Sequence, residues 1–184
     1  MKAMRIPVIF VGHGSPMIAL EALAGKGVKA SDSWGIDHGS WSVLRHIFPA
    51  ADIPVVQLSL SAAFSPREHY EAGRLLSGLR EQGFLIFASG NIVHNLREVD
   101  WNSDGGSPEC VRFNDLAVNA VLKRDDEALV DFRSLPDAAY AAPTPEHFIP
   151  LLYALGAGEG ESPRVFNNKC ELGAIAMSSF AFGM

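Results

Sequence analysis

Short apolar runs recur along the chain and end at residues typical of loops. The run Ile6–Val11 stops at Gly12, and similar runs cover Ile53–Leu60 and Phe84–Ser89. Continuous apolar runs of this length predict strands that are buried on both faces. Four strands are therefore expected, the last of them within Leu172–Phe182.

Helical periodicity appears between these runs. Ser65–Glu68 has the spacing of a capping box with proline at the first helical position, and apolar residues follow at helical period to a predicted end near Gly83. Further apolar stripes predict helices around Trp41–Phe48 and Phe113–Val121. The alternation predicts an α/β fold with a mostly parallel or mixed central sheet and helices on both faces. Its strands should deliver their following loops to a common edge.

Composition favours one globular domain over residues 1–184. The chain has 15 basic and 21 acidic residues, a net charge of −6, and is 48% hydrophobic. This length is sufficient to bury one complete core. An acidic balance without a Lys/Arg cluster makes a nucleic-acid partner unexpected.

Neither a membrane span nor a leader is expected. The longest uncharged stretches contain Gly, Pro or His and fall short of about 18 apolar residues. Met1–Arg5 is basic, but the apolar run after it is too short for a signal peptide. We therefore expect a cytoplasmic protein. Cys110 and Cys170 lack a Cys-x-x-Cys spacing and are expected to be reduced and structural.

Four of the six histidines stand beside Gly, Pro or Asn at the ends of apolar runs, namely His13, His38, His94 and His147. Imidazole is a common ligand of iron and zinc, and the same ring can move a proton near neutral pH. Converging histidines therefore suggest a metal site with an attached acid or base. For any one of them alone, a hydrogen-bonded loop histidine remains the alternative.

The other two histidines carry less weight. His69 falls on the predicted helix after Ser65 and is expected to be a satisfied helix-face residue, and His46 is expected at the surface. Near His147 the pattern is irregular, since a helix started at Pro145 would place the ring of Pro150 against a backbone carbonyl. Glu146 or His147 is therefore expected to face a site.

Other catalytic signatures do not fit. The stretch before Ser89 has Phe87 where a Gly-x-Ser-x-Gly nucleophile motif requires glycine. Gly25-Lys26-Gly27 lacks the spacing and hydroxyl residue of a phosphate-binding loop. Neither a serine hydrolase nor a nucleotide-binding protein is indicated.

Five motifs occur in order along nearly the whole chain: Gly12–Pro16, Trp34–Trp41, Asp52–Ser59, Ala88–Leu96 and Pro143–His147. Together they resemble the class III extradiol ring-cleavage dioxygenases of the LigB-like superfamily. Within it, the similarity is to the 4,5-DOPA dioxygenase extradiol subgroup. The resemblance implies an aromatic ring-opening oxidoreductase that cleaves a catechol-type substrate with dioxygen at a non-haem metal held by histidines.

The resemblance also implies residue roles. His13 and His147 correspond to metal ligands, and His94 to a catalytic base that in some zinc-loaded members touches the metal. His38 corresponds to a catalytic and substrate-binding residue that steadies or protonates the oxygen intermediate, with Ser15 also expected to bind substrate. Fe(II) is expected for activity, and zinc is compatible with the purified protein. The expected partners are a small catechol and dioxygen, and a homo-oligomer is compatible with the sequence.

One departure from the family is an apparent internal deletion near residues 21–33. Family members carry there a longer segment whose strand ends in Ser-Ala-His-Trp and supplies another metal-ligand histidine, and this chain has no such motif. We hypothesise that the residues between about Glu21 and Ser33 flank a segment that this sequence leaves out. The alternatives are a degenerate relative that binds a metal or partner, or a zinc hydrolase on the same fold.

Overall fold

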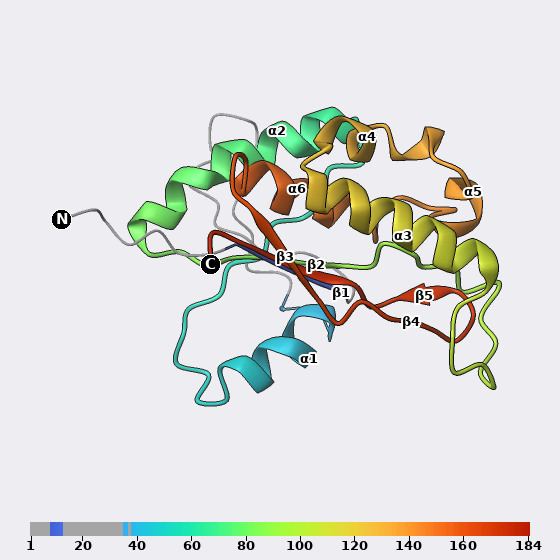
Figure 1. Ribbon diagram of the computed structural model, residues 1–184. Coiled ribbons are helices and arrows are strands. Elements are labelled where there is room, and N and C mark those ends of the chain that lie inside the picture. Colours follow the sequence, from blue (N-terminus) through green and yellow to red (C-terminus); the bar gives the residue numbers. More distant parts are fainter. Residues whose placement is uncertain (1–7, 13–34, 37) are drawn as a thin grey trace.

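The computed structural model describes residues 8–12, 35–36 and 38–184 (Figure 1). Four strands form the main sheet in the order β2-β1-β6-β3. Their bounds are Val8–Gly12 for β1, Ile86–Gly90 for β2, Pro163–Phe166 for β3 and Ser179–Phe182 for β6. A separate two-stranded sheet pairs β4 (Cys170–Glu171) with β5 (Ile175–Ala176).

The main sheet is mixed rather than mostly parallel in the part of the chain that is described. β1 and β2 run parallel from Val8↔Ile86 to Gly12↔Gly90, whereas β6 is antiparallel to both β1 and β3. The register at Gly12 and Gly90 confirms that two strands end at a common edge, as the sequence predicts. The loops that follow β1 and β2 therefore start side by side.

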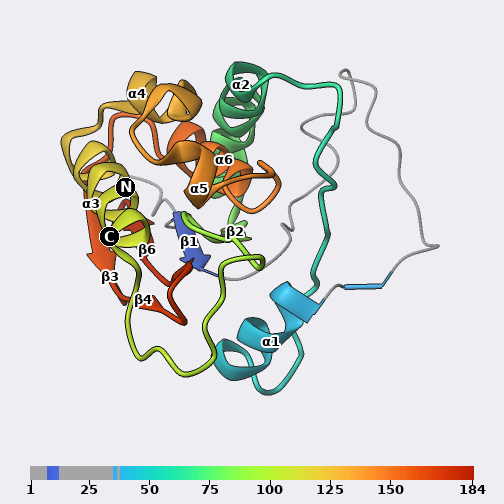
Figure 2. The ribbon, with the colours of Figure 1, turned by 90° about the vertical axis from the view of Figure 1, so that its right-hand side faces the viewer.

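Helices lie on both sides of this sheet (Figures 1 and 2). α6 packs on β1 and β2, α2 packs on α6, α3 lies near β3, and α1 contacts β2 from the other side. The larger helices are α1 (His38–Ile47), α2 (Pro66–Leu76), α3 (Pro108–Lys123) and α6 (Ile149–Ala157). The shorter ones are 3-10 helix η2 (Ser77–Gln82), α4 (Asp126–Val130), 3-10 helix η3 (Phe132–Ser134) and α5 (Ala138–Ala141).

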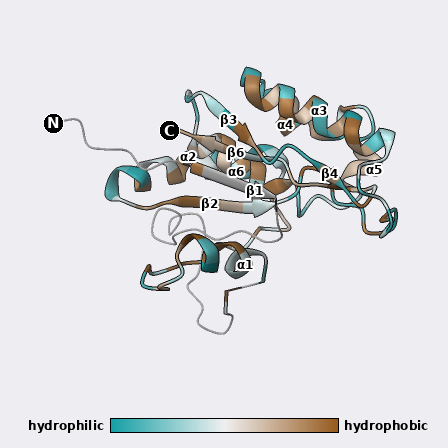
Figure 3. Ribbon diagram, turned by 60° about the horizontal axis from the view of Figure 1, so that its bottom comes forward, coloured by the Kyte–Doolittle hydropathy of each residue, from teal (hydrophilic) through white to brown (hydrophobic). Residues whose placement is uncertain are grey.

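Local sequence explains where the helices begin and end. Ser65 caps α2 by accepting from the Glu68 amide, while the Glu68 side chain accepts from the Ser65 amide, which confirms the capping box. The helical segment ends at Gly83, which has a left-handed backbone. α3 shows alternating hydrophobic and hydrophilic bands because only one of its faces is covered (Figure 3).

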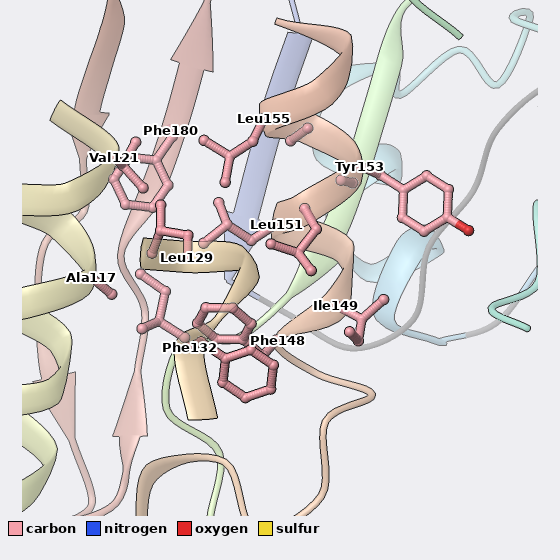
Figure 4. Close-up of a cluster of buried hydrophobic side chains, with 14 of the residues drawn as sticks. Ala117, Val121, Leu129, Phe132, Phe148, Ile149, Leu151, Tyr153, Leu155 and Phe180 are labelled. Carbon is pink, nitrogen blue, oxygen red and sulfur yellow. The ribbon is translucent and has the colours of Figure 1, made fainter. Parts of the chain in front are cut away.

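The core lies between α6, the sheet and the α3–α4 region. All nine residues of α6 are buried. The rings of Phe132 and Phe148 stack with centroids 4.2 Å apart, next to Leu151, Leu129 and Phe180 (Figure 4). Because α6 is apolar on every side, it acts as the central helix of the domain. No helix in the described segments is both long and apolar enough to cross a membrane.

The prediction of a strand at Ile53–Leu60 is wrong. The segment contains no strand, and Ile53, Val55 and Val56 are 50%, 39% and 39% exposed. An apolar run becomes a strand only when a neighbouring backbone pairs with it, and within the described residues this segment belongs to neither sheet. The run still contributes Leu58, which is buried in the core.

The strand predicted within Leu172–Phe182 is present as two strands, β5 and β6, which belong to different sheets. The predicted internal deletion near residues 21–33 lies outside the described residues, so it stays a hypothesis.

Candidate active site

The site is built where the ends of β1 and β2 meet the turn before α6. A Cβ atom placed on Gly90 would lie 2.2 Å from the carbonyl oxygen of His147. The adjacent Asn91 amide donates to that same oxygen at 2.8 Å. The absence of a side chain at Gly90 thus lets the His147 turn sit directly on the end of β2.

His94 is held by backbone contacts from two other regions of the chain. Its amide donates to the carbonyl of Ala141 at 2.8 Å, and it forms an antiparallel bridge with Ile175. The neighbouring Asn95 amide donates to Ala174 at 3.1 Å. These contacts fix the backbone that presents the half-buried imidazole.

The imidazole rings of His94 and His147 stack face to face. Their centroids are 3.6 Å apart and their planes are inclined by 15°. Both side chains are half-buried. Residues 53 positions apart in the chain are thereby joined in one cluster, as the sequence hypothesis requires for these two histidines.

A carboxylate accompanies this histidine pair. Burial acts to raise the pKa of Glu146, but the hydrogen bond from Thr144 and the nearby His147 and His94 outweigh it, so the pKa lies below its usual range. The Thr144 hydroxyl donates to the Glu146 Oε1 at 2.5 Å. Glu146 is therefore ionised near neutral pH and places negative charge beside the two imidazoles.

A pocket of about 430 Å³ opens beside this turn. Its lining includes Leu60, Phe64, His69, Arg133, Glu146 and Ile149. The Arg133 guanidinium lies 5.4 Å from the centre of the Phe132 ring and makes no ion pair with another described residue. Opposite charges on Arg133 and Glu146 therefore face one largely apolar space.

His69 forms the inner wall of this pocket. It is 3% exposed, and its Nδ1 lies 3.1 Å from the Tyr153 hydroxyl. Burial lowers the pKa of His69, and burial raises the pKa of Tyr153 to about 12. Both side chains are thus held neutral, and the expectation of a satisfied helix-face histidine is confirmed.

His38 starts α1 and is exposed. The first turn of α1 is tied to β2, because the Ser89 hydroxyl donates to the Gly39 carbonyl at 3.3 Å. His38 therefore starts a helix that is anchored to the strand preceding the His94 loop. His46 is exposed, as expected.

Two other predicted site residues, His13 and Ser15, lie outside the described residues. His13 follows directly on Gly12, whose backbone is paired with Gly90.

The irregular turn predicted before Pro150 is confirmed, because α6 begins only at Ile149. Sequence reasoning missed Arg133 and Tyr153, since neither stands in a motif and only the packing of η3 and α6 around the pocket reveals Arg133.

The chemistry of the donors suits a transition metal, although the described residues do not complete a site. Two imidazoles in contact offer the nitrogen ligands that iron and zinc favour. No group of three metal-ligating side chains gathers among residues 8–12, 35–36 and 38–184. A third protein ligand would therefore have to come from outside these residues.

The sequence of the chain is similar to a known protein family and to proteins of several organisms. The family model "Catalytic LigB subunit of aromatic ring-opening dioxygenase" matches residues 16–183. The chain is 40% identical over 179 residues to a 4,5-DOPA dioxygenase extradiol of Escherichia coli K12, and 34% identical over 177 residues to one of Beta vulgaris. Each match covers 92% of this chain but 66% of the relative.

A solved structure is also similar. The crystal structure of an uncharacterized protein from Escherichia coli K12 superposes with a TM-score of 0.79 at 34% identity. The superposition covers 96% of this chain and 80% of that one. The chain spans just under two thirds of the length of the Escherichia coli and Beta vulgaris relatives. Its α/β fold agrees with that of the solved neighbour.

Proposed function

Because this chain belongs to the LigB family of aromatic ring-opening dioxygenases, we propose that it opens a catechol-type ring with dioxygen, next to the two ring hydroxyls. The observation that carries the proposal is the stacked pair of His94 and His147 over the paired ends of β1 and β2. This is the edge at which open α/β sheets bind their ligands.

The proposed metal ligands are His13 and His147, with His94 as a third ligand or as the base beside the metal. The resident ion is proposed to be Fe(II) in the active protein, and zinc would occupy the same nitrogen donors. When bound, an Fe(II) ion would supply the Lewis-acid and redox chemistry that ring opening with dioxygen requires.

The protein residues supply binding and proton transfer. His94 is proposed to take the proton from a substrate hydroxyl, since an imidazole works as a base when its pKa lies near the working pH. After that transfer the His94 imidazole carries a positive charge. The ionised Glu146 stabilises this charge by electrostatic attraction. His38, at the start of α1, is proposed to bind the substrate and return a proton, with Ser15 contributing to substrate binding.

The pocket beside His147 favours a catechol that carries a charged tail. The relatives are named as dioxygenases of DOPA, a catechol amino acid. Arg133 offers a cation for a carboxylate, Glu146 offers an anion for an ammonium group, and the intervening lining is apolar. We propose a catechol amino acid as the substrate class.

The length of the relatives is relevant to the proposed missing segment. They are longer than this chain, although each match covers 92% of it. That difference is compatible with an internal segment, absent here, that adds a strand and a further histidine ligand. We propose that this segment lies between about Glu21 and Ser33.

The test is anaerobic reconstitution with ferrous iron, followed by exposure to air with L-DOPA and with 4-methylcatechol. We expect oxygen consumption and a yellow ring-opened product from the wild type. The His147→Ala variant should lose both metal and turnover, and His38→Ala should lose turnover with little loss of metal. The exposed His46→Ala variant is the control.

The outcomes separate the alternatives. Tight zinc binding with hydrolytic activity and no oxygen consumption would indicate a hydrolase, and failure to bind any metal would indicate a degenerate relative. Arg133→Ala should raise the KM for L-DOPA at least tenfold while leaving that for 4-methylcatechol unchanged, with Arg164→Ala, on β3, as the matched control. Equal effects on the two substrates would overturn the role of Arg133.

A further inference from the structure

The only two cysteines of the chain lie against each other, although 60 positions separate them. Cys110 is buried in the first turn of α3, and Cys170 is half-buried at the start of β4. A Cβ placed on Gly106 would lie 2.6 Å from the Cβ of Cys170 and 3.2 Å from the Sγ of Cys110. Both side chains therefore occupy the space that glycine leaves open at position 106.

The backbone around the pair is firmly connected. The Ser107 amide donates to the Gly173 carbonyl at 2.7 Å, and Gly106 bridges Gly173. The Ser107 hydroxyl accepts from the Cys110 amide at 3.1 Å and caps α3. The first turn of α3 is thus pinned to the loop between β4 and β5, which keeps the two side chains together.

The two thiols differ in acidity and access. The contact with Cys170 raises the pKa of the Cys110 thiol, and burial adds to the rise. The neighbouring Cys110 lowers the pKa of Cys170, although burial acts against this shift. Cys170 therefore forms a thiolate more readily than Cys110, and it is also the less buried of the two residues.

We propose that Cys170 and Cys110 form a redox modification site, in which Cys170 is the attacking sulfur and Cys110 resolves it into an intramolecular disulfide. The oxidant is a low-molecular-weight disulfide such as oxidised glutathione. The site requires neither a metal nor the dioxygenase reaction, so it stands independently of the proposed function.

The exchange proceeds in two balanced steps. The Cys170 thiolate attacks one sulfur of the oxidant, whose S–S bond breaks and releases one thiolate. The Cys110 thiol then loses its proton to solvent and attacks the Cys170 sulfur, which releases the second thiolate. In sum, the two cysteines lose two electrons and two protons, and the oxidant is reduced to two thiols.

The location of the pair connects it to the candidate active site. Cys170 pairs with Ala176 in the β4–β5 ladder, and the Ala176 amide donates to the Val93 carbonyl at 3.0 Å. The next residue along is His94, which bridges Ile175. A disulfide would therefore tether α3 to the hairpin that supports the His94 loop.

The experiment incubates the folded protein with oxidised glutathione and follows its intact mass under acid quench. The wild type should lose two hydrogen atoms and both reactive thiols, and a reductant should restore them. Cys110→Ser should stop at a mixed disulfide on Cys170. Cys170→Ser should stay unmodified for much longer, because Cys110 is buried.

Three results would overturn the proposal. These are a wild type that stays reduced, a wild type that stops at the mixed disulfide, and a Cys170→Ser variant modified as fast as Cys110→Ser. Circular dichroism checks that each variant is folded. If the Cys110→Ser variant fails that check, Cys110→Ala takes its place, and peptide mapping of the wild type tests the disulfide directly.

Discussion

At the scale of single residues, Gly90 and His69 show how packing sets the chemistry of the site. Gly90 leaves room for the His147 carbonyl at the end of β2, and His69 is buried against Tyr153 in the wall of the adjacent pocket. One acts through the absence of a side chain, and the other through the removal of an imidazole from water.

Gly90→Ala should displace the His147 turn, because the new Cβ would fall within 2.2 Å of the His147 carbonyl oxygen. We expect the free energy of unfolding to fall by about 1–3 kcal/mol, as for other overpacked sites, and metal binding to weaken. Urea unfolding and metal titration measure the two effects. Gly78→Ala is the control, since no atom lies within 4 Å of its added Cβ. Equal stability of both variants would contradict the close contact.

His69 should make stability fall in acid. Burial lowers its pKa in the folded state, so the unfolded state binds more protons once the pH drops below about 6.5, its ordinary value. The stabilising contribution is present above that pH and is lost as the pH falls towards the folded pKa. The free energy of unfolding of His69→Gln should therefore decrease less than that of the wild type between pH 7.5 and 5.5. Parallel pH profiles would exclude this role.

At the scale of elements, α2 is specified by its own ends. The reciprocal Ser65–Glu68 hydrogen bonds start it, the left-handed Gly83 closes the segment, and between them the helix packs mainly on α6. The segment of α2 and η2 lies in the connection between β1 and β2. Parallel strands need a long crossover connection of this kind, so the segment allows β1 and β2 to pair in parallel with their ends together at the site.

Ser65→Ala removes the side-chain half of the capping box. We expect the free energy of unfolding to decrease by about 1 kcal/mol, because an amide of the first turn loses its acceptor. Chemical denaturation measures the loss. Ser59→Ala, at an exposed position outside any helix, should change stability by less than about 0.5 kcal/mol. A similar loss in the two variants would show that the cap contributes nothing specific.

At the scale of the whole molecule, a buried ion pair joins parts that are far apart in the chain. Arg80 is fully buried in η2, and its Nη1 donates to Glu161 at 2.8 Å and to the Ala157 carbonyl at 2.9 Å. These contacts connect the β1–β2 crossover to the turn between α6 and β3. The Glu161 carboxylate thus lies in an ion pair with a fully buried guanidinium.

Glu161→Ala should therefore destabilise the protein strongly, by about 3 kcal/mol, because it removes the Glu161 carboxylate from its ion pair with the buried Arg80 guanidinium. Thermal and urea unfolding measure the loss. The surface pair of Arg67 and Glu127 provides the control: Glu127 is 78% exposed, and Glu127→Ala should cost less than about 1 kcal/mol. A small loss in both variants would mean that the burial of Arg80 does not depend on Glu161.

Much of the domain could be predicted from the sequence because the signals are local. The capping box at Ser65, the apolar stripe of α3 and the glycines that end β1 and β2 reflect interactions between near neighbours in the chain. The same holds for the irregular turn before Pro150, which follows from the geometry of proline. The motifs around His94 and His147 likewise identified the family before any fold was known.

Only the tertiary structure decided which of these segments meet. The Ile53–Leu60 run has the composition of a strand but finds no pairing partner in the described part of the chain, because a strand depends on a distant backbone that periodicity does not specify. The stacking of His94 on His147 at 3.6 Å, the contact of Cys110 with Cys170 and the placing of Arg133 and Glu146 on one pocket are decided in the same way. Hydrophobic burial assembles the elements without regard to sequence separation, and contacts between remote residues follow from that packing rather than from any local pattern.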